Sequence, residues 1–157
     1  MATQMGNPVK TRIGNPVVIV PEAGLAMQGL LKAIQGGGVP LQTLELVRLR
    51  ASQINGCGIC VDAHTAELRK AGASDERITA VAAWRDTPYF TEAERAALAL
   101  GEVVTRLSDR MDPVPDEVWE EAARHFHEAE LAILLLAIAG TNFFNRLHTA
   151  TKQWPPL

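Results

Sequence analysis

The chain has 157 residues, of which 47% are hydrophobic and 21% are charged, and its formal net charge is −3. These values predict one globular domain with a sizeable core, and the negative charge disfavours binding to nucleic acid or to an anionic membrane surface. The most apolar runs, residues 17–20 and 131–140, are too short for a secretory signal and for a membrane span, respectively. We therefore expect a cytoplasmic protein.

The predicted elements, taken in chain order, are all helical. Scattered Gly and Pro over residues 1–20 predict an irregular N-terminal arm, and a helical domain follows over residues 21–157. Apolar residues at helical spacing mark each helix, and turn signals such as Asn55-Gly56 separate them. Thr91 and Glu94 form a capping box at one helix start. The predicted helices cover residues 21–34, 40–54, 57–71, 74–84, 91–107, 116–126 and 128–149. Because no segment shows the sustained alternation of a strand, the predicted fold is all-α, a single-domain bundle of about seven helices.

Both cysteines of the chain, Cys57 and Cys60, lie in one short segment, "NGCGICVDAH", which ends at His64. Residues three and four apart share a helix face, so the two sulfurs and the imidazole are expected to line one stripe. The first turn of a helix stabilises a thiolate, and a histidine one turn after Cys60 can take the proton of its thiol. The segment therefore predicts a reactive dithiol near the start of a helix.

A fourth group is expected from the preceding helix. If the chain reverses at Asn55-Gly56, the two helices run antiparallel. Glu45 then lies about 15 Å back along its helix, and His64 lies about 10 Å along the next one. These depths differ by roughly one turn, so Glu45 can reach His64, orient the imidazole and raise its basicity.

Together these positions give the pattern E-x11-C-x2-C-x3-H-x7-G, from Glu45 through Cys57, Cys60 and His64 to Gly72. The pattern resembles the core signature of the AhpD-like alkylhydroperoxidases, in the carboxymuconolactone decarboxylase superfamily. Further segments, "TEAERAALALGEVVTRL", "VPDEVWEEAARHF" and "NFFNRLH", resemble the helices that follow this core. The resemblance covers most of the chain beyond about residue 21.

The resemblance implies a peroxidase that uses no metal and no organic cofactor. Cys60 would be the sulfur that peroxide attacks, Cys57 would be the proton donor and disulfide partner, and His64 with Glu45 would relay protons. It also implies a homo-oligomer, either a trimer or a hexamer. A peroxidase of this kind requires a dithiol reductant, and the sequence does not decide between a lipoyl protein, a thioredoxin and a small dithiol. One departure concerns Ile59, because some family members have a second histidine at that position.

Other interpretations of the motif are possible. Two buried cysteines can simply be inert core residues. Cys57, Cys60, His64 and Glu45 could together bind Zn²⁺, although a CxxC with one histidine is half of a typical zinc site. The protein could also be a redox-sensing scaffold with little turnover, or a lactone decarboxylase, whose chemistry does not require the dithiol.

The remaining histidines have simpler interpretations. His125 and His127 are two residues apart and point to different sides of a helix, so solvated or capping roles are expected. His148 lies near the end of the last helix, where a positive charge is favoured, and no further role is predicted for it.

The sequence does not decide the roles of two further groups of side chains. Asn142, Asn145 and Arg146 stand at helical spacing beside two phenylalanines, which is typical either of a packed helix end or of a subunit interface. Trp84 and Phe90 can be core residues or can line a substrate pocket.

Overall fold

The computed structural model describes residues 10–154, and among these residues there are helices and no strand. Residues 1–9 of the predicted arm and residues 155–157 of the predicted helical domain lie outside this range. The described elements are α1 (Pro16–Ile19), α2 (Pro21–Gln35), α3 (Leu41–Asn55), α4 (Gly58–Lys70), α5 (Asp75–Ala80), η1 (Val81–Asp86), α6 (Glu92–Thr105), η2 (Leu107–Asp109), α7 (Asp116–His125) and α8 (Glu128–Thr151). The predicted all-α fold is confirmed.

Local sequence signals set several helix boundaries. Thr91 and Glu94 form the predicted capping box at the start of α6. Gly72 adopts a left-handed conformation, with φ of 83°, directly after Ala71, the C-cap of α4. Within the predicted irregular arm the structure adds the single turn α1, which the side chain of Asn15 caps before Pro16. Four residues are too few for a periodic pattern, so the sequence did not predict this turn.

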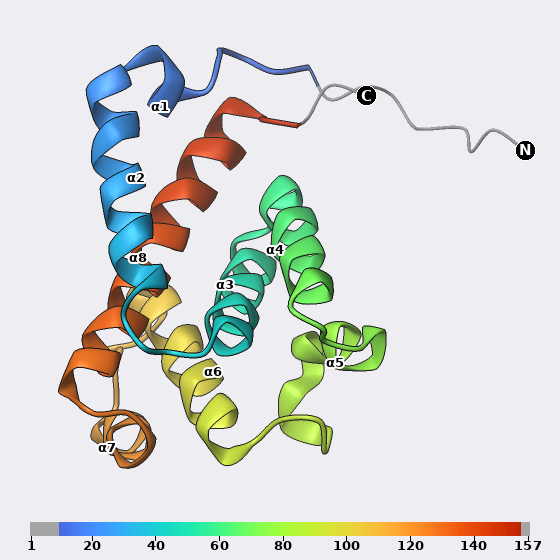
Figure 1. Cartoon of the computed structure of the whole chain (residues 1–157), viewed down its shortest axis with the longest axis vertical. Coiled ribbons are helices and arrows are strands. Elements are labelled where there is room, and N and C mark those ends of the chain that lie inside the picture. Colours follow the sequence, from blue (N-terminus) through green and yellow to red (C-terminus); the bar gives the residue numbers. More distant parts are fainter. Residues whose placement is uncertain (1–9, 155–157) are drawn as a thin grey trace, which may run out of the picture.

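Helix α3 is the central element of the bundle. It lies between α4 and α8 and also packs against α6 (Figure 1). One core cluster joins it to α2, α6 and α8, and a second joins it to α4, α5, η1 and α6 on its other side. Because neighbours surround α3, even its charged residues Glu45 and Arg48 are buried. Buried charges need partners, so this packing concentrates polar contacts along α3.

The segment after α5 departs from the predicted regular helix. It continues as the 3-10 helix η1, with a kink at Ala83. The kink places Trp84 in the second core cluster, where its indole N–H donates to the carboxylate of Glu102 over 3.0 Å. Phe90 belongs to the same cluster, so both aromatic residues are core residues.

The last helix, α8, has the length and hydropathy that a membrane span requires, unlike the ten-residue run within it. Its contacts are those of a core helix. Residues such as Leu134 and Ile138 are fully buried, and the helix packs against α2, α3, α6 and α4. Its C-terminal end is also tied to the arm, because the Arg12 N–H donates to the carbonyl of Thr151 over 2.9 Å.

Candidate active site

The site begins at the turn between α3 and α4. Gly56 has φ of 67°, a left-handed conformation that suits glycine, and it lets the chain reverse directly after Asn55. The side-chain amide of Asn55 donates to the Oδ1 atoms of both Asn142 and Asn145 on α8, over 2.9 Å each. Cys57 then occupies the N-cap of α4. The turn that presents the cysteines is therefore pinned to α8.

The two asparagines thus have a packing role within the subunit. Asn145 also donates to the hydroxyl of Ser52 on α3, and Asn142 donates to that of Thr105 on α6. Arg146 donates to the backbone carbonyl of Asn142 one turn earlier. Of the two interpretations that the sequence left open, the packed helix end is the one that these contacts support.

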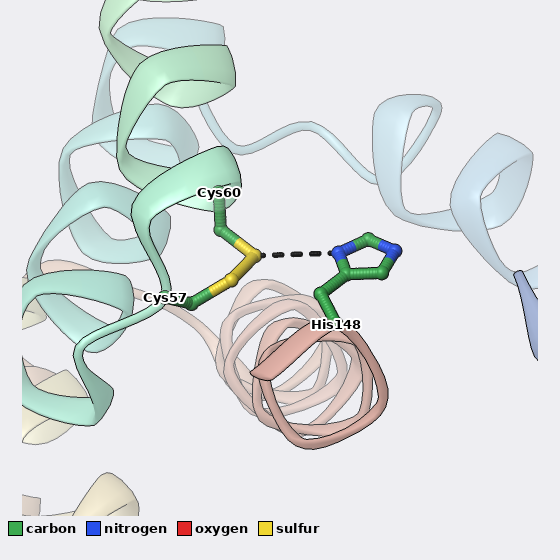
Figure 2. A group of neighbouring side chains, drawn as sticks. All are labelled: Cys57, Cys60 and His148. Carbon is green, nitrogen blue, oxygen red and sulfur yellow. Dashed lines mark hydrogen bonds between the residues drawn. A yellow bond between two sulfur atoms is a disulfide. The ribbon is translucent and has the colours of Figure 1, made fainter. Parts of the chain in front are cut away.

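Cys57 and Cys60 form a disulfide (Figure 2). Both residues are buried, and Cys60 lies in the first turn of α4. Among the described residues, the one cluster with metal-ligand spacing is Cys57, Cys60 and His148, whose ligand atoms lie within 4.8 Å of one another. It differs from the zinc set that the sequence suggested, since His64 and Glu45 are not members. The two sulfurs are bonded to each other, so the pair is in its oxidised, disulfide form.

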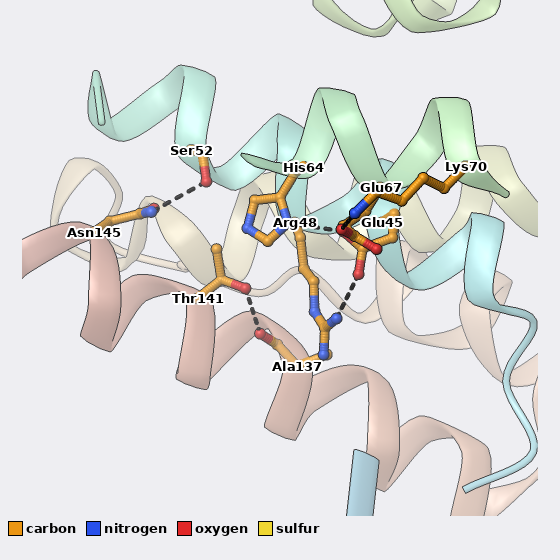
Figure 3. A network of polar contacts seen from close by, with 9 residues as sticks. All are labelled: Glu45, Arg48, Ser52, His64, Glu67, Lys70, Ala137, Thr141 and Asn145. Carbon is orange, nitrogen blue, oxygen red and sulfur yellow. Dashed lines mark hydrogen bonds and ion pairs between the residues drawn. The ribbon is translucent and has the colours of Figure 1, made fainter. Parts of the chain in front are cut away.

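Glu45 and His64 meet as the register of the turn predicts. Glu45 Oε2 lies 2.7 Å from His64 Nδ1, and Arg48 Nη1 donates to Glu45 Oε1 over 2.5 Å (Figure 3). Burial of Glu45 opposes its ionisation. The hydrogen bond and charge of His64, together with those of Arg48, outweigh burial and hold the pKa of Glu45 below its ordinary value of 4.5. Glu45 is therefore a carboxylate that can orient His64.

The imidazole in contact with the sulfur of Cys60 belongs to a residue for which the sequence predicted no role. His148 Nδ1 lies 3.5 Å from the sulfur of Cys60 (Figure 2). Burial lowers the pKa of His148 below 6.5, its ordinary value. The sequence offered one weak signal for this contact, since His148 lies one turn after Phe144 on the apolar last helix.

A cavity of about 300 Å³ lies next to Cys60. Cys60 and His64 from α4, Arg48 from α3 and His148 from α8 supply its reactive and charged groups. The rest of its wall is largely apolar and comes from Leu31, Ile34, Ile59, Ala63, Ala137, Gly140 and Phe144, with Thr141 and Asn145 as polar exceptions. The cavity can therefore admit an organic molecule next to the sulfur of Cys60.

The remaining two histidines lie outside the site. The ring of His125 contacts Glu121 one turn earlier on α7, and His127 caps α8 by accepting from the N–H of Glu130. The predicted solvated and capping roles are confirmed.

The fold and the site define a class: an all-α protein with a CxxC pair at the start of a helix, next to a buried glutamate that is paired with a partly exposed histidine. Comparison with known proteins agrees. The model of the carboxymuconolactone decarboxylase family matches residues 21–102, which is more than half of the chain. The chain belongs to this family, and within it to the AhpD-like members.

Individual relatives extend over most of the chain. An uncharacterized Bacillus subtilis protein, YdfG, is 34% identical over 132 residues, which cover 84% of this chain and 88% of YdfG. A solved structure of an Agrobacterium tumefaciens protein of unknown function has a TM-score of 0.86 at 36% identity, and the match covers 94% of this chain and 99% of that one. The alkyl hydroperoxide reductase AhpD of Hyphomonas neptunium is 50% identical over 50 residues, which cover 32% of this chain and 28% of that enzyme.

The same fold occurs in proteins with other chemistry. The debrominase Bmp8 has a TM-score of 0.79 at 22% identity, covering 89% of this chain and 74% of Bmp8. This likeness shows a shared fold alone, so the activity must be argued from the site.

Proposed function

We propose that the protein is a thiol peroxidase that reduces hydroperoxides through a dithiol/disulfide cycle of Cys57 and Cys60. The observation that carries the proposal is the Cys57–Cys60 pair with Cys60 on the wall of an apolar cavity that His64 also lines. Glu45, hydrogen-bonded to His64, completes a proton relay next to this cavity.

The cycle has three balanced steps. The thiolate of Cys60 attacks the terminal oxygen of ROOH, so that an S–O bond forms, the O–O bond breaks and the alkoxide leaves to be protonated to ROH. The thiol of Cys57 then attacks the sulfenic acid of Cys60, which releases water and forms the disulfide. A dithiol reductant exchanges with this disulfide and leaves oxidised, which restores both thiols. His64, oriented by Glu45, relays the proton that the alkoxide requires.

The cavity favours organic hydroperoxides over hydrogen peroxide. Its wall is mostly aliphatic and aromatic, and burial of an apolar substrate body contributes about 25 cal/mol per Å² of surface removed from water. Hydrogen peroxide would gain none of this. The reductant must meet a similar condition, since both cysteines are buried, so we propose a slender dithiol such as a lipoyl group.

The test is steady-state hydroperoxide consumption with dihydrolipoamide as the reductant, compared between the wild type and Cys60→Ser. The proposal predicts turnover in the wild type that Cys60→Ser abolishes, and a higher kcat/KM for cumene hydroperoxide than for hydrogen peroxide. Equal consumption by the two proteins would instead support a redox sensor with little turnover, or chemistry that does not use the dithiol.

Assembly into a trimer or hexamer is part of the same proposal. Apolar side chains are exposed on α1, α2 and α8, including Val18, Leu25, Leu136 and Phe143. Exposed apolar surface of this kind is typical of faces that a partner copy covers. Light scattering should give a mass of three or six times 17.0 kDa, and a stable 17.0 kDa species at micromolar concentration would contradict the assembly.

A further inference from the structure

The sulfur of Cys60 has a second histidine beside it, from a helix far away in the sequence. His148 lies 88 residues after Cys60, and its Nδ1 atom is 3.5 Å from Sγ (Figure 2). Hydrogen bonds to sulfur are longer than those to oxygen, so this distance corresponds to direct contact. By contrast, Nδ1 of His64 is occupied by Glu45, and within residues 10–154 the ring nitrogen in contact with the sulfur of Cys60 is that of His148.

The position of His148 is held by its surroundings on α8. One turn earlier the ring of Phe144 lies 5.8 Å from the imidazole, centroid to centroid, and Asn145 is bonded to α3 through Ser52. Two residues after His148, at the C-terminal end of α8, the guanidinium of Arg12 donates to the carbonyl of Ala150 over 2.9 Å. The imidazole therefore meets the sulfur on a supported helix and not on a loop.

The surroundings of His148 also favour its neutral form. α2 contributes only apolar residues to the cavity, Leu31 and Ile34, while the charged or titratable groups there are Arg48 from α3 and Cys60 and His64 from α4. Burial holds the pKa of His148 below 6.5, and no carboxylate lines this cavity among the described residues. Burial thus favours the neutral imidazole at neutral pH, and once the disulfide is reduced, the Nδ1 lone pair of the tautomer protonated at Nε2 faces the thiol of Cys60 and can accept its proton.

We propose that His148 is the catalytic base that deprotonates the thiol of Cys60, and that the Glu45–His64 pair serves the oxygen of the leaving alkoxide instead. The assignment deepens the proposed peroxidase function and rests on it for the second half. The S–H bond of Cys60 breaks and its proton moves to Nδ1 of His148, which leaves the thiolate to attack ROOH. His64, held by Glu45, donates a proton to the alkoxide, and solvent returns one proton from His148 to His64.

The experiment separates the two histidines in a protein with a single thiol. In the Cys57→Ser background, the rate of alkylation of Cys60 by iodoacetamide is measured against pH, because it reports thiolate formation without any peroxide. His148→Asn and His64→Asn are compared, since asparagine places a hydrogen-bonding atom near the position of Nδ1 but is not a base. His127→Asn is the matched control on the surface, where asparagine is also a good N-cap.

The two histidine variants should slow different reactions of Cys60. His148→Asn should move the alkylation profile to higher pH and slow alkylation at pH 7 by about tenfold or more, which is the lower part of the usual range for a lost base. His64→Asn should leave that profile in place and slow only sulfenic acid formation with cumene hydroperoxide, by about 100-fold. His127→Asn should change neither rate.

Two outcomes would overturn the proposal: an unchanged alkylation profile in His148→Asn, or the same shift in His64→Asn. If His148→Asn fails to fold by circular dichroism, NMR titration of His148 in the wild type decides, because alkylation of Cys60 must then shift the His148 midpoint. An unshifted midpoint would count against the proposal. If the wild type consumes no hydroperoxide, the peroxidase function fails, whereas a shifted alkylation profile would still establish the coupling of His148 to Cys60.

Discussion

Replacing Glu45 by glutamine tests the Glu45–His64 pair with little change in shape. In the wild type the two carboxylate oxygens divide their partners, since Oε1 accepts from Arg48 and Oε2 faces Nδ1 of His64. Glutamine offers one oxygen and one NH₂ group. Arg48 is buried and already has one guanidinium nitrogen without a partner, so we expect it to retain the oxygen. The NH₂ group would then face Nδ1 of His64 and force the tautomer with its proton on Nε2.

The magnitude follows from the two contacts. Loss of the correct tautomer removes the proton relay, and general acid–base assistance is worth about 100-fold or more in rate. Loss of a charged hydrogen-bond acceptor in a buried site costs about 1.5–3 kcal/mol of the free energy of unfolding. Glu45→Gln should therefore oxidise Cys60 with hydroperoxide about 100-fold more slowly and unfold at a lower urea concentration.

Stopped-flow measurement of Cys60 oxidation by cumene hydroperoxide, in parallel with iodoacetamide alkylation, provides the assay. We expect the first rate to fall and the second to remain within a few-fold of the wild type, because alkylation leaves no alkoxide to protonate. Equal oxidation rates in Glu45→Gln and the wild type would refute the relay and assign Glu45 a purely structural role.

Two further predictions concern acid stability and the redox readout. Burial opposes ionisation of Glu102, but hydrogen bonds from Arg85, Trp84 and Arg50 outweigh it and hold its pKa below 4.5. The contribution of Glu102 to stability is thus present above pH 4.5 and is lost as the pH falls through the folded-state pKa. In urea titrations, Glu102→Gln should lower the free energy of unfolding at pH 7 and make it decrease less steeply below pH 5. Parallel curves of unfolding free energy against pH for the variant and the wild type would contradict this. A Cβ atom on Gly58 would lie 3.1 Å from the ring of Trp154, so the indole covers the segment between the cysteines. Reduction of the disulfide should therefore raise Trp154 fluorescence, and a redox-linked change that persists in Trp154→Phe would contradict this placement.

The part of the site that could be predicted from sequence is the part made by neighbouring elements. Glu45 and His64 are 19 residues apart and are connected by one turn, so the helical rise and the turn at Asn55-Gly56 were enough to place them together. The capping box at Thr91 and the left-handed Gly72 are local in the same sense.

The contact of His148 with Cys60 depends on information that is not local. It requires the position of α8 against α4, which is fixed by core packing and by the bonds from Asn55 to Asn142 and Asn145. A histidine near the C-terminal end of a helix is also explained by the favourable interaction of a positive charge with the helix dipole, so a contact with the sulfur was not expected from the sequence. The kink at Ala83 escaped prediction for a similar reason, because burial of Trp84 overrides the helical pattern.

The central claim, that Cys57 and Cys60 together reduce a hydroperoxide, is tested most directly in a single turnover. The fully reduced protein is mixed with one equivalent of cumene hydroperoxide without any reductant, and thiols, alcohol and disulfide are measured at the end point. The proposed cycle predicts one alcohol formed and two thiols lost per subunit, with Cys57 and Cys60 joined in a disulfide that mass spectrometry identifies. Retention of both thiols with the hydroperoxide unchanged would contradict the claim.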